Sequence, residues 1–135
     1  MTARFVESVP SWTAQWIENF WFSKRFKGRA RARAARSQKH RGEGRFVYDF
    51  VDGVGGDFDF GIDYHECAVW SFLQRQQAPE LAPFVCALDQ LYSKRFGWGL
   101  KRTTTLAEGG PQCDFRFRRG APTEIASTVL PVGRF

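Results

Sequence analysis

Cys67 is the residue of this chain best suited to act as a nucleophile. It follows His65 and Glu66, at the point where an alternating, strand-like pattern gives way to a helical one. The dipole and the free N–H groups at a helix N-terminus favour the thiolate form of a cysteine. A neighbouring histidine or carboxylate can serve as its base. The alternative interpretation is a small buried hydrophobic residue, since most free cysteines are of that kind.

Cys86 and Asp89 lie three residues apart in a segment with helical periodicity, so they share one face of the predicted helix. A carboxylate at the edge of a core often has the perturbed pKa that general acid–base catalysis requires. The alternative for Asp89 is a solvated or salt-bridged helix residue.

A predicted hairpin near the C-terminus adds a thiol and two arginines. Cys113 falls on the inward face of its strand with two phenylalanines, which favours an inert core thiol. Asp114 and Arg116 share the opposite face, and Arg102 lies on the partner strand. A cross-strand ion pair is the simpler interpretation, and bidentate binding of a substrate carboxylate by an arginine is the alternative.

Metal and cofactor signals are weak. The three cysteines could hold a metal together with His65 and Asp89, but no two of these residues have a diagnostic spacing. The glycine-rich residues 53–56 lack both the P-loop lysine and the dinucleotide-binding pattern, so we interpret them as a turn. We therefore expect no cofactor.

An N-terminal helix beginning near Pro10 is predicted by an aromatic stripe with helical spacing. We expect this stripe to pack on the core, and a helix that binds a partner is the alternative. The stripe consists of Trp12, Trp16, Phe20, Ile17 and Trp21.

The remaining elements predict an α+β fold, with an antiparallel sheet of about four strands in two hairpins and helices packed on one face. Alternation is clearest where Phe58, Phe60, Ile62 and Tyr64 face one way. In the weakly patterned tail, Ile125 and Val129 could dock. The predicted strands are residues 46–51, 58–64, 100–106 and 113–118, and the predicted helices are residues 66–76 and 80–96.

The net charge of +6 is a local feature, because no acidic residue lies between Glu18 and Glu43. This basic run could extend the helix as a solvated end or linker, or form a patch for nucleic acid, anionic lipid or an acidic partner. Phe26 is its only aromatic residue, so no base-stacking platform is evident. The run contains Lys24, Arg25, Lys27, Arg29, Arg31, Arg33, Arg36, Lys39 and Arg41.

The 135 residues suit a single domain, with residues 1–45 as an N-terminal helix and basic extension and residues 46–119 as the core. The N-terminus matches neither a signal peptide nor an anchor, and the odd number of cysteines favours reduced thiols in the cytoplasm. We expect a small-molecule substrate and no membrane partner, and both a monomer and a homo-oligomer are compatible with the sequence.

Four motifs in order resemble the L-2-amino-thiazoline-4-carboxylic acid hydrolase family, over residues from about 46 to 119. One departure is His65, which stands where the family pattern has threonine. The motifs are H-E-C-A (65–68), P-E-L-A-P-F-V-C-A-L-D (79–89), G-L-K-R-T-T-T-L-A-E-G (99–109) and C-D-F-R-F (113–117).

The resemblance implies opening of a 2-aminothiazoline carboxylate ring to an N-carbamoyl cysteine. Such a reaction needs a nucleophile or activated water, an acid for the leaving group and a cation for the carboxylate. We assign Cys67 as nucleophile, Glu66 or Asp89 as acid–base, and Arg102 or Arg116 as carboxylate clamp. The alternatives are a non-catalytic domain that binds a small ligand and an adaptor acting through the basic run. The full catalytic set is Cys67, Glu66, Asp89 and Cys113, and the substrate-binding set is Arg102, Arg116, Asp114, Thr105, Cys86 and His65.

Overall fold

A five-stranded sheet forms the base of the molecule. The structure is a computed structural model, and it describes residues 2–42 and 44–126. The strand order is β1-β2-β4-β3-β5, and every pairing is antiparallel except that of β3 with β5. The predicted α+β class and both hairpins are confirmed. The fifth strand comes from the tail, where Ile125 docks as predicted, and Val129 lies outside the described residues. The strands are β1 (Val47–Asp52), β2 (Phe60–Glu66), β3 (Leu100–Arg102), β4 (Cys113–Phe117) and β5 (Glu124–Ile125).

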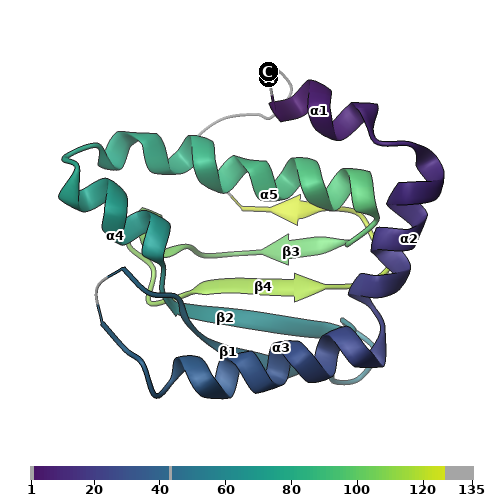
Figure 1. Ribbon diagram of the computed structural model, residues 1–135, viewed down its shortest axis with the longest axis horizontal. Helices are drawn as coiled ribbons and strands as arrows, with labels where there is room; N and C mark the ends of the chain where they lie inside the picture. Colours follow the sequence, from purple (N-terminus) through teal and green to yellow (C-terminus); the bar gives the residue numbers. More distant parts are fainter. Residues whose placement is uncertain (1, 43, 127–135) are drawn as a thin grey trace.

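Helices cover one face of this sheet, as the sequence predicts (Figure 1). Helix α3 lies across β1, whereas α5 runs along β3 on the same side of the sheet. The short helix α4 follows β2 and leads into α5. The helices are α1 (Thr2–Ser8), α2 (Ser11–Trp21), α3 (Lys24–Ser37), α4 (Ala68–Arg75) and α5 (Ala82–Phe96), with single 3₁₀ turns η1 (Pro79–Leu81) and η2 (Leu106–Glu108).

The two faces of the sheet differ because side chains alternate along each strand. Phe60 and Ile62 point toward the helices and join Leu100 in the buried core. Asp63 and Arg116 are on the opposite face, where they form a salt bridge of 2.7 Å. This arrangement confirms the alternation for residues 60–64. Phe58 was predicted to face inward with them, but it precedes β2 and lies under the Arg116 guanidinium, 5.4 Å from its ring centroid, on the opposite face. Among the described residues, no helix covers that polar face.

Several element boundaries differ from the predicted ones, each for a local reason. Strand β3 ends at Arg102 instead of residue 106, because the Asp114 carboxylate accepts the backbone N–H groups of Thr103 and Thr104, both at 2.8 Å. Strand β2 continues to Glu66, so α4 begins at Ala68 and not near Glu66.

The prediction that the aromatic stripe of α2 packs on the core is wrong for its main members. Trp12 is 77% exposed and Trp16 is 64% exposed. The helix is apolar on more than one side, and it turns Ala14 and Trp21 inward instead. Trp21 stacks on Trp98 with ring centroids 4.1 Å apart, which fills the space beside the sheet.

The basic run forms a separate helix, α3, instead of an extension of α2. The Ser23 side chain caps α3 by accepting a hydrogen bond from the Phe26 N–H at 3.1 Å. Ala30 and Ala34 are buried in this helix, while most of its Lys and Arg residues are exposed. Within residues 2–42 and 44–126, none of the helices is long and apolar enough to cross a bilayer.

Candidate active site

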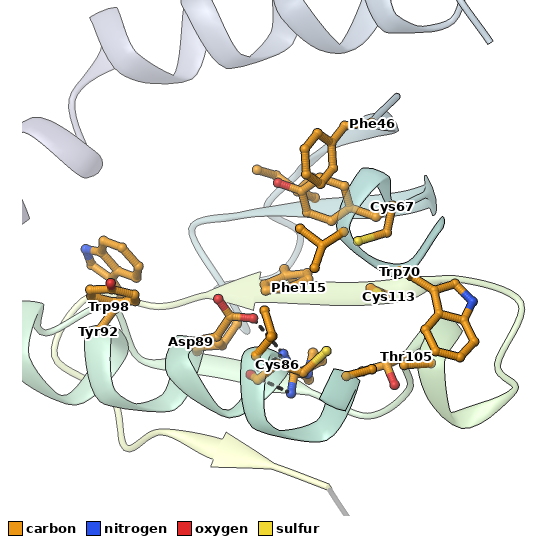
Figure 2. Close-up of a pocket in the computed structure, with 18 of the residues that line it drawn as sticks. Phe46, Cys67, Trp70, Cys86, Asp89, Tyr92, Trp98, Thr105, Cys113 and Phe115 are labelled. Atoms are coloured by element: carbon orange, nitrogen blue, oxygen red, sulfur yellow. Dashed lines mark hydrogen bonds and ion pairs between the residues drawn. The ribbon is translucent and has the colours of Figure 1, made fainter. Parts of the chain in front are cut away.

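A pocket of about 350 Å³ lies between α5, α4 and the helix-covered face of the sheet (Figure 2). Its volume is near the lower end of the range of about 300–1,000 Å³ for small-molecule sites. Most of its lining is apolar. Its polar groups come from both helices, from the three strands β2, β3 and β4, and from the turn between β3 and β4. These polar lining residues are Tyr64, Cys67, Cys86, Asp89, Tyr92, Arg102, Thr105 and Cys113.

Asp89 and Arg102 form an ion pair in the wall of this pocket. The Nη1 atom of Arg102 donates to Oδ2 of Asp89 at 2.8 Å and to the carbonyl oxygen of Cys86 at 3.3 Å. The Arg102 side chain is only 3% exposed, whereas that of Asp89 is 38% exposed. Burial among protein atoms raises the pKa of Asp89, and the charge of Arg102 partly offsets that rise. Asp89 can therefore carry a proton closer to neutral pH than an ordinary carboxylate.

Cys67 occupies the N-cap position of α4, at the predicted junction between strand and helix. Its backbone is extended, and its carbonyl oxygen accepts the first helical hydrogen bond from Ser71 at 3.0 Å. The side chain is half-buried and lines the pocket. An N-cap side chain lies beside the free N–H groups of the first helical turn, which can donate to a thiolate.

The other two thiols line the same pocket in an environment that keeps them neutral. Burial raises the pKa of Cys86 to about 11, against a smaller opposing effect of Arg102. Burial also raises the pKa of Cys113, although the Leu106 N–H donates to its sulfur at 3.3 Å. Neither residue is thus favoured as a thiolate near neutral pH.

Asp114 supports the pocket from the opposite face of the sheet instead of lining it. Its carboxylate accepts the N–H groups of Thr103 and Thr104 and the hydroxyl of Thr103. The turn that follows places buried Thr105 in the pocket wall, with its hydroxyl accepting the Glu108 N–H at 3.2 Å. Gly110 closes this turn, since a Cβ atom there would lie 1.9 Å from Thr104 Oγ1.

Three candidate residues lie away from the pocket. Arg116 pairs with Asp63 on the open face of the sheet. On the same face, Nε2 of His65 lies 2.7 Å from Oδ2 of Asp49. The Glu66 carboxylate accepts the Gly42 N–H at 3.1 Å. Of the alternatives left open by the sequence, Asp89 and Arg102 are therefore the pocket residues, and Glu66 and Arg116 are not.

The aromatic lining of the pocket was not predicted from the sequence as part of the site. Trp70, Tyr92 and Trp98 line the cavity (Figure 2). Trp21 from α2 also contributes to its lining. One feature of the sequence could have pointed to Trp98, because this residue lies between Gly97 and Gly99, where the chain can turn sharply. Gly97 adopts the left-handed conformation, with φ of 65°, and ends α5 so that the chain turns back beneath that helix.

In the part of the chain that the structure describes, no three His, Cys, Asp or Glu side chains are grouped so that they could hold a metal ion. The pocket offers the Cys67 thiol at the N-cap position of α4, two thiols whose pKa is raised by burial, and the Asp89–Arg102 ion pair.

Fold and site together define a small α+β protein with a thiol-lined pocket. The chain belongs to the L-2-amino-thiazoline-4-carboxylic acid hydrolase family, whose model matches residues 12–117. This match confirms the resemblance carried by the four motifs and begins further toward the N-terminus, so that it includes α2 and α3. No match was found to a curated protein or to a solved structure.

Proposed function

We propose that this protein is a hydrolase that opens a 2-aminothiazoline-4-carboxylate-like ring to an N-carbamoyl amino acid, with Cys67 as nucleophile. One observation carries the proposal. Cys67, Asp89 and Arg102 come from three different elements and line one pocket in a member of this family. A nucleophile, a proton carrier and a cation are the three groups that such a ring opening requires.

The first step forms a covalent adduct. Cys67 passes its proton to the amidine nitrogen of the substrate, and its sulfur bonds to the ring carbon between nitrogen and sulfur. The bond from this carbon to the ring sulfur then breaks, and Asp89 protonates the departing sulfur. The product of this step is an isothiouronium joined to Cys67, with the ring open and all substrate atoms retained.

Water completes the reaction at the same carbon. Asp89, now a carboxylate, accepts a proton from the attacking water and returns to its starting form. The bond to Cys67 breaks, the hydroxyl proton passes to its sulfur, and an N-carbamoyl amino acid leaves. One water molecule is consumed in total.

Arg102 serves two purposes in this scheme. While Asp89 is protonated, the guanidinium is available to pair with the carboxylate of the substrate. Once Asp89 has given up its proton, the same guanidinium stabilises the new carboxylate at 2.8 Å. The raised pKa of Asp89 supports this alternation, because it brings the protonated form of this carboxyl closer to neutral pH.

Assay of ring opening with the wild-type protein and a Cys67→Ala variant tests the proposal. We expect turnover by the wild type and a loss of at least about a hundredfold in the variant. A Cys86→Ala variant is the matched control, since its thiol lines the same pocket but is held neutral. Binding of the carboxylate without turnover by the wild type would favour a non-catalytic ligand-binding domain instead.

The basic helix α3 supports a second candidate function, that of an adaptor for nucleic acid or acidic surfaces. Most of its cations are exposed, which suits contact with an extended anion. Phe26, the aromatic residue of the run, packs inward on Trp21 with centroids 4.5 Å apart and cannot stack on bases. A titration of nucleic-acid binding against salt tests this function, and a flat response in log salt would argue against it.

A further inference from the structure

The pocket is long in comparison with a single thiazoline ring. Its lining along α5 extends from Ala82 to Tyr92, which is about 15 Å at a rise of about 1.5 Å per residue. On the sheet it extends along β4 from Cys113 to Phe117, which is about 14 Å at about 3.4 Å per residue. A thiazoline carboxylate spans only about 6 Å, given bond lengths of about 1.5 Å.

The two ends of the pocket differ in chemistry. Figure 2 shows Cys67 and Cys113 on one side of Asp89, with Tyr92 and Trp98 on the other. We call these the thiol end and the aromatic end. Since the reacting groups are at the thiol end and beside Asp89, a bound ring there leaves the aromatic end free.

The rings of the aromatic end are held in place by contacts with one another and with neighbouring rings. The Trp98 ring stacks on Trp21 with an interplanar angle of 13° and meets Phe117 edge-on at 6.1 Å. Tyr92 lies with its ring centroid 6.4 Å from that of Trp98. These rings present apolar surface to the cavity. Binding of an apolar group that displaces water from this surface is favourable, because apolar area is removed from water.

We infer that the substrate of this site carries a flat or extended apolar substituent, which reaches past Asp89 to Tyr92 and Trp98. The substrate class is therefore an aryl- or alkyl-extended cyclic amidine carboxylate and not the bare ring. This inference rests on the proposed function for its reacting group, and on the length and lining of the pocket for the substituent.

Turnover of two substrates tests the inference directly. The pair is 2-aminothiazoline-4-carboxylate and a derivative that bears a phenyl ring on a short linker. We expect kcat/KM for the extended substrate to exceed that for the bare ring by at least about tenfold, since even one methylene in an apolar pocket can be worth that factor. Equal values, or a higher value for the bare ring, would overturn the inference while leaving the proposed function in place.

Variants of Tyr92 locate the preference in the pocket. Tyr92→Ala should lower the ratio of the two kcat/KM values by about tenfold, and Tyr92→Phe, which keeps the ring, should preserve it. Phe5→Ala is the matched control, because Phe5 is 71% exposed on α1. Thermal unfolding verifies that the Tyr92 variants are folded, and an unchanged ratio in folded Tyr92→Ala would contradict the inference.

A binding measurement separates this inference from the proposed function. Quenching of tryptophan fluorescence would report the binding of 3-phenylpropanoate and of propanoate, which share a carboxylate and lack the reacting ring. We expect a Kd at least about tenfold lower for 3-phenylpropanoate. A preference for 3-phenylpropanoate without turnover of either thiazoline would contradict the proposed hydrolase function and support the inferred apolar substituent. Equal Kd values would contradict the inferred substituent.

Discussion

Arg102 donates a hydrogen bond to the carboxylate of Asp89 at 2.8 Å, and both side chains line the pocket that also holds Cys67. The pair joins β3 to the middle of α5 across the base of the site. Asp89 and Arg102 therefore hold two elements of the fold together and also supply the acidic and the cationic group that the proposed reaction uses.

Replacing Asp89 by Asn should remove the proton carrier while keeping an oxygen for Arg102. We expect kcat to fall by at least about a hundredfold, the lower range for general acid–base catalysis. In the wild type, activity should fall as pH rises through the raised pKa of Asp89, since the first step needs the protonated acid. Profiles of kcat against pH for both proteins measure this.

Asp63→Asn is the control for that variant, because Asp63 pairs with Arg116 on the open face of the sheet. It should keep the wild-type pH profile. A residual alkaline limb in Asp89→Asn at the wild-type position would contradict the assignment.

Arg102 and Arg116 were both candidate carboxylate clamps, and the structure separates them. Arg102→Gln should raise KM by about tenfold or more, since it removes a charge-assisted contact worth about 1.5–3 kcal/mol. Arg116→Gln should leave KM near the wild-type value, because that guanidinium pairs with Asp63 outside the pocket. Steady-state kinetics of both variants, after a check of folding by circular dichroism, decide between them. The reverse order of effects would refute our placement of the substrate.

The sequence predicted most of this framework because its strongest signals are local. Alternation along residues 60–64 places Ile62 and Tyr64 toward the helices, and the helical spacing of Cys86 and Asp89 puts both on the pocket side of α5. The same reasoning located Cys67 at the start of a helix. Each of these features depends on neighbours in the chain.

What the sequence could not provide was the choice between equivalent faces and distant partners. The two sides of α2 are both aromatic, and only tertiary packing selects Trp21 over Trp12 for the interior. Asp114 and Arg102 are close in the predicted hairpin, yet Arg102 pairs with Asp89 from α5 instead. The parallel pairing of β5 with β3 likewise joins segments with no shared local pattern.

Asp114 should matter for stability more than for chemistry. Its carboxylate holds two backbone N–H groups and one hydroxyl of residues 103 and 104. Asp114→Ala should lower the free energy of unfolding by about 1–3 kcal/mol, because these donors lose their acceptor. Urea titration measures this change, and Lys101→Ala on the same face of the neighbouring strand β3 is a suitable control. An unchanged midpoint for Asp114→Ala would show that the turn does not depend on this carboxylate.

The neutral state of Cys86 predicts a pH dependence of stability. Its pKa is about 11 in the folded protein, above the ordinary value of 9.0 that applies to the unfolded chain. The folded state therefore retains this proton longer, and its contribution to stability is complete below about pH 9 and is lost as pH rises toward 11. Unfolding by urea across this range should show a steeper loss of stability in the wild type than in Cys86→Ala. Parallel curves for the two proteins would contradict the burial argument.

The most direct test of the central claim is intact-protein mass spectrometry during a single turnover of the thiazoline substrate. Acid quenching should trap a species heavier than the free protein by the mass of one whole substrate molecule, because ring opening by Cys67 loses no atoms. Peptide mapping should place this adduct on Cys67, and the species should be absent from Cys67→Ala. Turnover without an adduct, an adduct on Cys86 or Cys113, or full activity in Cys67→Ala would contradict the account.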